Sequence, residues 1–287
     1  MSDKKRILIT GASQGFGHDT AKALAERGHT VFATMRGVEG KNRKVAEDLR
    51  AWAENGGHAL HVLELDVTNE ASVSAAITKA IQQAPLDTVI NNAGVGTFGV
   101  QEAFSTQQVQ TIFDVNVLGP LRVNKAVLPS MRKAGKGHIV YVSSGVGRVT
   151  MPFLGPYGAT KYALEALAEA ADMELRPLGI KVSVIQPGAY GTGFVQNAFQ
   201  PDDGTLIDDY GPVKQMFEGF NAHFEQQIAS GNIGDPKEVA DAIVANVEAE
   251  DPALRVPVGA DMKDALDAIN GVSAQVQAGL RQAMGLE

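Results

Sequence analysis

Residues 10–17 read Thr-Gly-Ala-Ser-Gln-Gly-Phe-Gly, and this glycine-rich stretch decides the fold. It follows a short apolar run over Arg6–Thr10 that predicts a strand, and it opens a predicted helix over Phe16–Arg27. Glycines let the backbone turn tightly and approach a pyrophosphate, whose charge the N–H groups at a helix N-terminus attract. This strand–loop–helix context predicts a dinucleotide-binding loop. The residues assigned to the cofactor here are Gly11, Ser13, Gln14, Gly15, Phe16 and Gly17.

The same loop also matches Gly-x-Ser-x-Gly, the pattern of a hydrolase nucleophile elbow. Such an elbow normally follows several strands rather than the first one. The histidines late enough to complete a triad are His138 and His223, and no recognisable loop frames either of them. The pattern therefore favours dinucleotide binding over hydrolysis.

Outward from the loop, short strand patterns alternate with helical ones. Further strands are predicted over Thr30–Met35, Ala59–Glu64, Thr88–Asn91, His138–Ser143, Lys181–Ile185 and Arg255–Val258. Helices are predicted over Lys41–Asn55, Glu70–Gln83, Gln107–Lys133, Tyr157–Leu175 and Pro236–Ala249. This alternation predicts an α/β fold with a doubly wound parallel sheet, the Rossmann fold, as a single domain over residues 1–287.

The last third of the chain has a different character. Phe194–Ser230 shows no strand pattern, and its aromatic residues Phe217, Phe220 and Phe224 fall at helical spacing. This aromatic stripe fits either an apolar substrate pocket or the segment's own core. We expect residues 189–235 to form a helical substrate lid inserted in the domain. A closing helix is expected to carry an apolar stripe of Leu266, Ile269, Val276 and Leu280.

Composition excludes several classes of function. The net charge of −8 is a poor match for nucleic acid or an anionic membrane, which both require a basic face. The absence of cysteine excludes disulfides and thiolate metal sites, and the scattered histidines predict no metal site. No apolar run is long enough for a membrane span or a signal peptide, so we expect a cytoplasmic protein.

The end of the second predicted strand bears on the choice of nicotinamide cofactor. NAD-binding folds of this kind place an acidic residue there for the ribose 2′-hydroxyl, whereas this strand ends at Arg36. With Lys41, Arg43 and Lys44 nearby, Arg36 can bind a 2′-phosphate, so we predict NADP(H) in preference to NAD(H). Asp66, after the third strand, can accept from the adenine amino group or cap a helix with Thr68.

A catalytic group is predicted on the helix that begins near Tyr157. Tyr157 and Lys161 stand four residues apart and so share one helix face. A phenol titrates near pH 10, and a neighbouring ammonium favours its ionised form, which suits acid–base catalysis near neutrality. Ser144 can hydrogen-bond the same substrate oxygen. Phe153 and Leu154 flank this group and are candidates for the substrate pocket, together with Ser144 and Tyr157.

In combination these motifs resemble the short-chain dehydrogenase/reductase family, in its compact single-domain branch. The resemblance rests on Thr10–Gly17, Asp66-Val67, Asn91-Asn92-Ala93-Gly94, Asn116-Val117, Ser143-Ser144, Tyr157–Lys161 and Pro187-Gly188 with Thr192. It is nearest to NADP(H)-dependent hydroxysteroid and retinol dehydrogenases over residues 31–36 and 187–194. Gln14 departs from the basic residue that many NADP enzymes carry, and Tyr190 from a commoner aliphatic residue or Phe.

The resemblance implies a role for each matching position. Tyr157 would be the acid/base, Ser144 a donor to the substrate oxygen, Lys161 a ligand of the nicotinamide ribose, and Asn116 the holder of a relay water. The remaining cofactor contacts would be Asp66, Val67, Asn92, Ala93, Gly94, Pro187, Gly188, Tyr190 and Thr192.

The expected activity is hydride transfer between NADP(H) and a carbonyl or secondary alcohol of a medium-sized apolar substrate. The alternative is an NADPH-binding redox sensor on the same fold without turnover. Surplus apolar and alanine positions on residues 118–133 and 157–175 predict pairing of subunits, as a homodimer or homotetramer.

Overall fold

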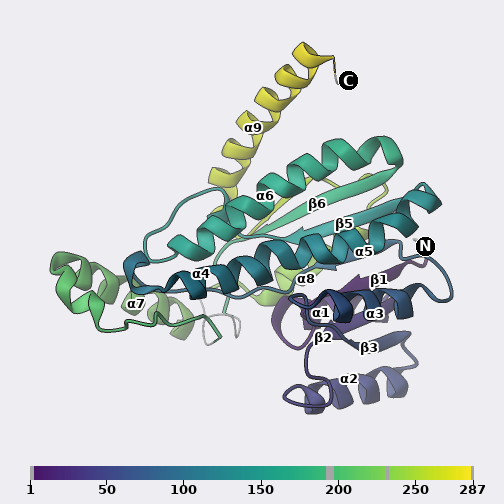
Figure 1. Ribbon diagram of the computed structural model, residues 1–287, viewed down its shortest axis with the longest axis horizontal. Helices are drawn as coiled ribbons and strands as arrows, with labels where there is room; N and C mark the ends of the chain where they lie inside the picture. Colours follow the sequence, from purple (N-terminus) through teal and green to yellow (C-terminus); the bar gives the residue numbers. More distant parts are fainter. Residues whose placement is uncertain (1–2, 192–196, 231–232, 286–287) are drawn as a thin grey trace.

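The computed structural model of the chain describes residues 3–191, 197–230 and 233–285 (Figure 1). A seven-stranded sheet runs through its centre in the order β3-β2-β1-β4-β5-β6-β7, and every neighbouring pair is parallel. The strands are β1 (Arg6–Ile9), β2 (Thr30–Met35), β3 (Leu60–Glu64), β4 (Thr88–Asn91), β5 (Gly137–Val142), β6 (Ile180–Pro187) and β7 (Arg255–Val258).

Helices cover both faces of this sheet, which confirms the predicted doubly wound α/β fold. One face is packed by α1 (Gly15–Glu26), α2 (Arg43–Gly56) and α8 (Pro236–Glu248). The other is packed by α3 (Glu70–Ile81), α5 (Gly119–Ala134) and α6 (Gly155–Leu175).

The two cores explain why the strands are apolar at successive positions. In β1, Ile7 and Ile9 belong to the core beneath α1, whereas Leu8 belongs to the core beneath α3 and α5. All three side chains are fully buried. A parallel strand covered on both faces needs apolar residues throughout, and burying each contributes roughly 1.5–3 kcal/mol.

The predicted single helix over Gln107–Lys133 is wrong, because the chain breaks it into three parts. These are α4 (Thr106–Phe113), a π-helical turn (Asp114–Leu118) and α5. Pro120 has no N–H to donate to the carbonyl of Asn116, so regular α-helical bonding cannot continue through this point. The break moves Asn116 into the widened turn, where its side chain is buried.

The C-terminal part contains a short 3₁₀ turn (Leu206–Tyr210), α7 (Pro212–Ala229) and α9 (Lys263–Met284). Figure 1 shows α9 projecting away from the sheet. Only Leu266 of its predicted stripe is buried, while Val276 and Leu280 are more than half exposed, so most of that stripe finds no core within the chain. Among the described residues, the structure contains no helix with the length and apolar character needed to cross a membrane.

Candidate active site

Three of the predicted catalytic side chains meet at the carboxyl ends of β5 and β6. Tyr157 and Lys161 project from the first turns of α6, and the Lys161 Nζ lies 5.7 Å from the centre of the Tyr157 ring. Ser144 follows β5 by two residues, and its hydroxyl is hydrogen-bonded with the Tyr157 hydroxyl. Lys161 donates to the carbonyl of Val142, at 2.9 Å, which fixes the ammonium at the end of β5.

Asn116 is held beside this group by its side-chain amide. Its Oδ1 accepts from the Val95 backbone N–H at 2.9 Å, and its Nδ2 donates to the Val95 carbonyl at 2.8 Å and to the Thr160 hydroxyl at 3.0 Å. Thr160 in turn donates to the Tyr157 carbonyl at 2.7 Å. The π-helical turn is therefore tied directly to the start of α6.

Gly94 fits closely between Asn116 and Lys161. A Cβ added to Gly94 would lie 3.4 Å from the Asn116 Oδ1 and 3.8 Å from the Lys161 Nζ. The backbone after β4 thus borders the catalytic group, as the sequence motif implies. All four predicted catalytic positions gather in one place.

Burial governs the ionisation of both catalytic groups. It raises the pKa of Tyr157 to about 12, against the opposing hydrogen bond with Ser144. It lowers the pKa of Lys161 to about 8, against the opposing charge of Glu165. The chain by itself therefore gives Tyr157 a pKa above its ordinary value, not the lowered one expected beside an ammonium, because loss of hydration outweighs the hydrogen bond with Ser144.

The glycine-rich loop has the shape that a pyrophosphate requires. Gly11 and Gly15 adopt φ angles of +70° and +57°, which other residues adopt only with strain. Gln14, at the N-cap of α1, makes no side-chain capping bond, so the first N–H groups of α1 are left for a ligand. A Cβ on Gly17 would lie 2.3 Å from the Asn92 Nδ2, and this position therefore requires glycine.

Asn92 locks the loop to the end of β4. Its Nδ2 donates to the carbonyls of Thr10 and Gly11, at 2.9 and 3.0 Å. The Thr10 hydroxyl accepts from the backbone N–H groups of Asn92 and Ala93, both at 3.0 Å. β1 and β4 flank the point where the strand order reverses, which is where open α/β sheets bind ligands. These residues fit a dinucleotide.

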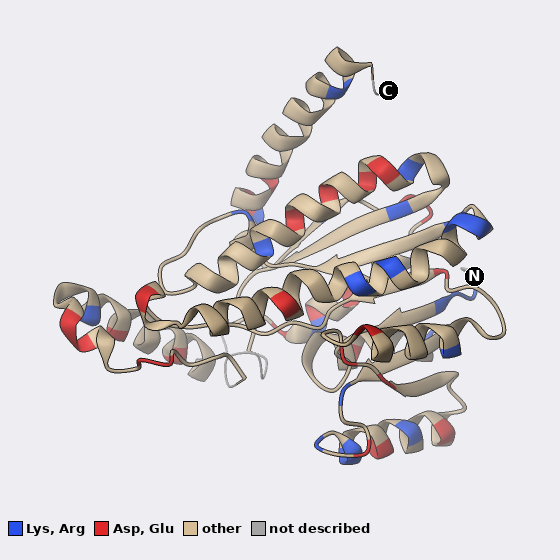
Figure 2. Ribbon diagram, viewed as in Figure 1, with Lys and Arg blue, Asp and Glu red and all other residues tan. Residues whose placement is uncertain are grey.

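Arg36 stands at the exposed end of β2, with further basic residues at the start of α2 (Figure 2). The loop after it is fixed by Glu64, whose two carboxylate oxygens accept from the N–H groups of Gly37 and Val38 at 2.8 Å each. Glu64 was not predicted, and its sequence position gives no hint of this contact across β2 and β3.

Asp66 accepts from both the N–H and the hydroxyl of Thr68, at 3.0 and 2.8 Å. Burial pushes the pKa of Asp66 upward, but the Thr68 bonds and the charges of Arg36 and Lys41 outweigh it and lower that pKa. The helix cap of α3 is Asn69, so Asp66 is not the capping residue of α3. Its carboxylate is half-exposed near Arg36, and Val67 behind it is buried.

The backbone after β6 is held by a residue that the sequence did not reveal. The carboxylate of Asp261 accepts from the Ala189 N–H at 3.1 Å, and a Cβ on Gly188 would lie 2.1 Å from the Asp261 Oδ1. Pro187 and Gly188 therefore lie between Ser144 and Asp261. The Tyr190 hydroxyl is used within the chain, donated to Glu238 at 3.1 Å. Thr192 lies outside the described residues.

The two candidate pocket residues lie in different apolar clusters. Leu154 packs with Tyr157 itself, whereas Phe153 packs edge-on against Phe217 and Phe220 of α7, with ring centres 5.0 and 5.8 Å apart. Phe98, which was not predicted, contacts the same two rings at 5.2 and 5.5 Å. Phe153 is the one non-glycine residue with a positive φ, 65°, among the described residues. Phe217 and Phe220 of the stripe on α7 thus pack against the segment that leads into α6.

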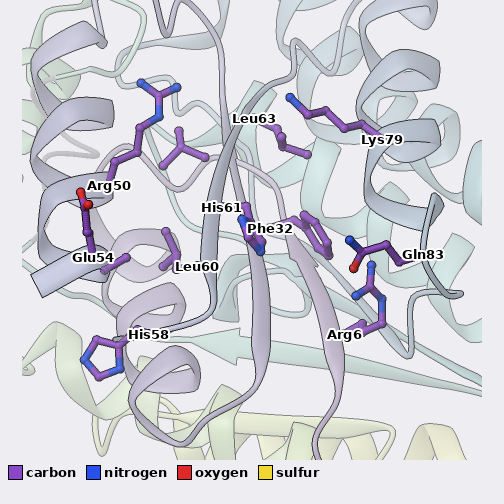
Figure 3. Close-up of a pocket in the computed structure, with 12 residues that line it drawn as sticks. Arg6, Phe32, Arg50, Glu54, His58, Leu60, His61, Leu63, Lys79 and Gln83 are labelled. Atoms are coloured by element: carbon purple, nitrogen blue, oxygen red, sulfur yellow. The ribbon is translucent and has the colours of Figure 1, made fainter. Parts of the chain in front are cut away.

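A groove of about 450 Å³ lies elsewhere, around the edge strand β3. Figure 3 shows Arg50 and Glu54 of α2 on one side of it and Lys79 of α3 on the other. None of its lining residues belongs to the predicted site, so we do not assign the site to this groove. The described residues contain no cluster of three or more His, Cys, Asp or Glu side chains suited to a metal ion.

Comparison with known proteins gives consistent matches. A family model described as short chain dehydrogenase matches residues 5–203. The chain is 36% identical to a 3-ketodihydrosphingosine reductase of Bacteroides thetaiotaomicron, over 88% of this chain and 87% of that protein. It is 34% identical to estradiol 17-beta-dehydrogenase 1 of Rattus norvegicus, over 88% of this chain and 73% of that protein.

A solved structure is similar along the whole chain. The crystal structure of a short-chain dehydrogenase from Streptomyces avermitilis superposes with a TM-score of 0.77. The two are 30% identical in sequence, and the match covers 99% of this chain and 100% of that one. The similarity therefore includes α7 and α9 as well as the sheet.

Proposed function

This chain belongs to the short-chain dehydrogenase/reductase family, and from that premise we propose that it is an NADP(H)-dependent oxidoreductase with Tyr157 as its acid/base. Its reaction is hydride transfer between the nicotinamide and a carbonyl or secondary alcohol of a medium-sized apolar compound. The observation that carries the proposal is the convergence of Tyr157, Lys161 and Ser144 beside a loop that fits a dinucleotide.

In this reaction the cofactor supplies or accepts the hydride. Tyr157 gives its hydroxyl proton to the substrate oxygen during reduction and takes it back during oxidation. Ser144 donates a hydrogen bond to the same oxygen, and Lys161 stabilises the phenolate that Tyr157 becomes. Asn116 binds the backbone of Val95 after β4 and the Thr160 hydroxyl, and so holds the start of α6 against that backbone.

Cofactor choice is proposed from the charges at the end of β2. Arg36 is exposed, and Lys41 lies close enough for both to lower the pKa of Asp66. These cations suit the additional phosphate of NADP(H), and Glu64 orders the loop that carries them. An acidic residue that would select the ribose of NAD(H) is absent from the end of β2.

The substrate is proposed to be apolar because of the surfaces that border Tyr157. Leu154 packs beside its ring, and Phe153 joins α6 to the aromatic side chains of α7. We assign residues 189–235 as the lid over the substrate, with α7 as its main helix. Weakly charged, aromatic walls recognise cyclic or long-chain ketones and alcohols better than sugars or acids.

Subunit pairing is proposed through α5 and α6. Leu121 of α5 and Tyr162 and Met173 of α6 are each 41% exposed, so both helices present large apolar side chains to solvent. Burying such a face between two copies would form a homodimer or, with a second interface, a homotetramer.

The direct test compares Tyr157→Phe with Tyr162→Phe, an exposed tyrosine on the same helix. NADPH oxidation is followed with a panel of cyclic ketones, apolar aldehydes and β-keto esters, and NADPH affinity is measured by fluorescence. We expect Tyr157→Phe to lose at least 10³-fold in turnover with little change in NADPH affinity, while Tyr162→Phe keeps both. Turnover retained by Tyr157→Phe refutes the assignment, and NADPH binding without any turnover by the native chain supports a redox sensor instead.

A further inference from the structure

Behind the catalytic group lies a buried carboxylate that the reaction scheme does not use. Glu165 follows Lys161 by one helical turn on α6 and is 1% exposed. An ionisable side chain so deeply buried is costly unless donors and opposite charges surround it. Its surroundings therefore indicate what it does.

The donors come from the ends of two other strands. Gln186, at the end of β6, directly precedes Pro187. Its Nε2 donates to both carboxylate oxygens of Glu165, at 3.1 and 3.0 Å. The Ser143 hydroxyl, adjacent to Ser144, also faces Glu165 and lowers the pKa of its carboxyl. One carboxylate thus joins α6 to β5 and β6 directly beneath the residues that would contact substrate and nicotinamide.

A close backbone approach makes this arrangement possible. A Cβ on Gly147 would lie 2.9 Å from the Ser143 Oγ, 3.1 Å from the Glu165 Cγ and 3.2 Å from the Lys161 carbonyl carbon. The turn after Ser144 therefore packs against α6 between Lys161 and Glu165. On the far side, Asn270 of α9 donates to the Gln186 Oε1 at 2.7 Å, so the base of α9 orients the amide that binds Glu165.

The charges facing Glu165 come from three elements. Lys161 lies on its own helix, Arg148 on the segment after β5, and Arg255 on β7. Glu169, one turn further along α6, binds both arginines, with Arg148 at 2.9 Å. Burial raises the pKa of Glu165, while the Gln186 amide, the Ser143 hydroxyl and the two arginines oppose that rise. All of these partners suit the ionised carboxylate.

We propose that Glu165 is a positioning residue whose buried carboxylate keeps the Lys161 ammonium charged and holds α6 against the ends of β5 and β6. The inference rests on the proposed function, because it assigns Glu165 a task only through Lys161 and Tyr157. A nearby negative charge favours proton binding, so its loss shifts the titration of the Tyr157–Lys161 pair to lower pH, whichever member loses the proton.

The test compares Glu165→Gln with Glu169→Gln, a matched change one turn away among the same arginines. NADPH affinity is measured by fluorescence between pH 6 and pH 9.5, and the pH profile of kcat/KM is measured on the best carbonyl substrate. Both NADPH affinity and kcat/KM should fall at alkaline pH, where the Tyr157–Lys161 pair loses its proton. We expect Glu165→Gln to move the midpoint of this alkaline fall about 1 pH unit lower. Glu169→Gln should leave the position of that fall unchanged.

Two further variants separate charge from structure. Gln186→Leu removes the amide donor but keeps the carboxylate, so it should lower the thermal midpoint with little movement of the alkaline fall. Glu165→Asp keeps the negative charge but withdraws it by one methylene. It serves in place of Glu165→Gln if Glu165→Gln does not fold, and it should move the alkaline fall in the same direction by a smaller amount. An unmoved profile in the folded Glu165 variant, or equal shifts for Glu169→Gln, overturns the proposal. Because the affinity measurement needs no turnover, it tests Glu165 even if no carbonyl is reduced.

Discussion

Replacing Lys161 with Met should make the folded protein more stable while removing its activity. The fall of the Lys161 pKa from 10.5 to about 8 measures how strongly the folded chain disfavours the ammonium. At about 1.4 kcal/mol per pKa unit, this is a penalty of about 3 kcal/mol at neutral pH. Methionine removes the charge at similar length, but it leaves the Val142 carbonyl without its donor, which costs about 1 kcal/mol. The net gain should be about 2 kcal/mol.

The pH dependence gives this prediction its distinctive form. Between pH 8 and pH 10.5 the unfolded chain still binds the lysine proton and the folded chain has released it, so native stability rises with pH over this window. The advantage of Lys161→Met is therefore complete below pH 8 and is lost by about pH 10.5.

Urea unfolding followed by the fluorescence of Trp52, the sole tryptophan, measures the effect. At pH 7 the Lys161→Met midpoint should lie roughly 0.5–1 M above that of the native chain, and the difference should shrink at pH 9.5. Lys79→Met, at an exposed lysine on α3 outside the proposed subunit interface, is the control and should show neither change. Equal midpoints at pH 7, or a difference that persists unchanged at pH 9.5, would refute burial as the cause of the low pKa.

Three other predictions concern the cofactor, the π-helical turn and the lid. Arg36→Ala should weaken NADPH binding at least tenfold and leave NADH binding nearly unchanged in parallel titrations; equal losses would make Arg36 only a surface charge. Asn116→Ala removes three hydrogen bonds and should cost about 1–3 kcal/mol in thermal unfolding, and an unchanged midpoint would contradict the bracing role. Phe153→Gly relieves a strained φ but loses ring contacts with Phe217 and Phe220, so limited proteolysis should cut α7 faster, whereas equal cleavage rates would separate Phe153 from the lid.

Much of the fold could be predicted because its signals are local. The run Ile7–Ile9 is apolar at every position, which indicates a strand buried on both faces, and the structure buries all three side chains. The glycine loop could be predicted for the same reason, because its pattern over Thr10–Gly17 lies directly between a strand and a helix. The structure adds that a Cβ on Gly17 would meet the Asn92 side chain. The grouping of Tyr157 and Lys161 followed from their helix spacing, and Ser144 was added because it follows a predicted strand shortly before Tyr157.

What could not be predicted depends on contacts between distant segments. Asp261 meets Gly188 only because β7 lies beside β6, and neither residue carries a pattern that points to the other. The break at Asn116 interrupts an otherwise helical periodicity, and a proline near the start of α5 was an insufficient signal of a π-helical turn. The apolar stripe of α9 could be predicted from its helical periodicity. Periodicity does not show whether such a stripe faces the chain's own core, and only Leu266 of this one does.

The opposite shifts of Tyr157 and Lys161 have one cause, and they give the two directions of the proposed reaction different pH dependences. Burial penalises the phenolate and the ammonium alike, raising one pKa to about 12 and lowering the other to about 8. At neutral pH the pair therefore holds a neutral phenol beside a charged ammonium, the state from which the proposed acid Tyr157 would give its proton to the substrate oxygen. Oxidation must first remove a proton from the pair. We expect reduction to be nearly constant from pH 6 to pH 7 and to fall toward pH 8, and oxidation to rise from pH 6 to pH 8, in initial-rate profiles. An oxidation rate independent of pH there would show that the bound complex ionises Tyr157 far more easily than the chain alone.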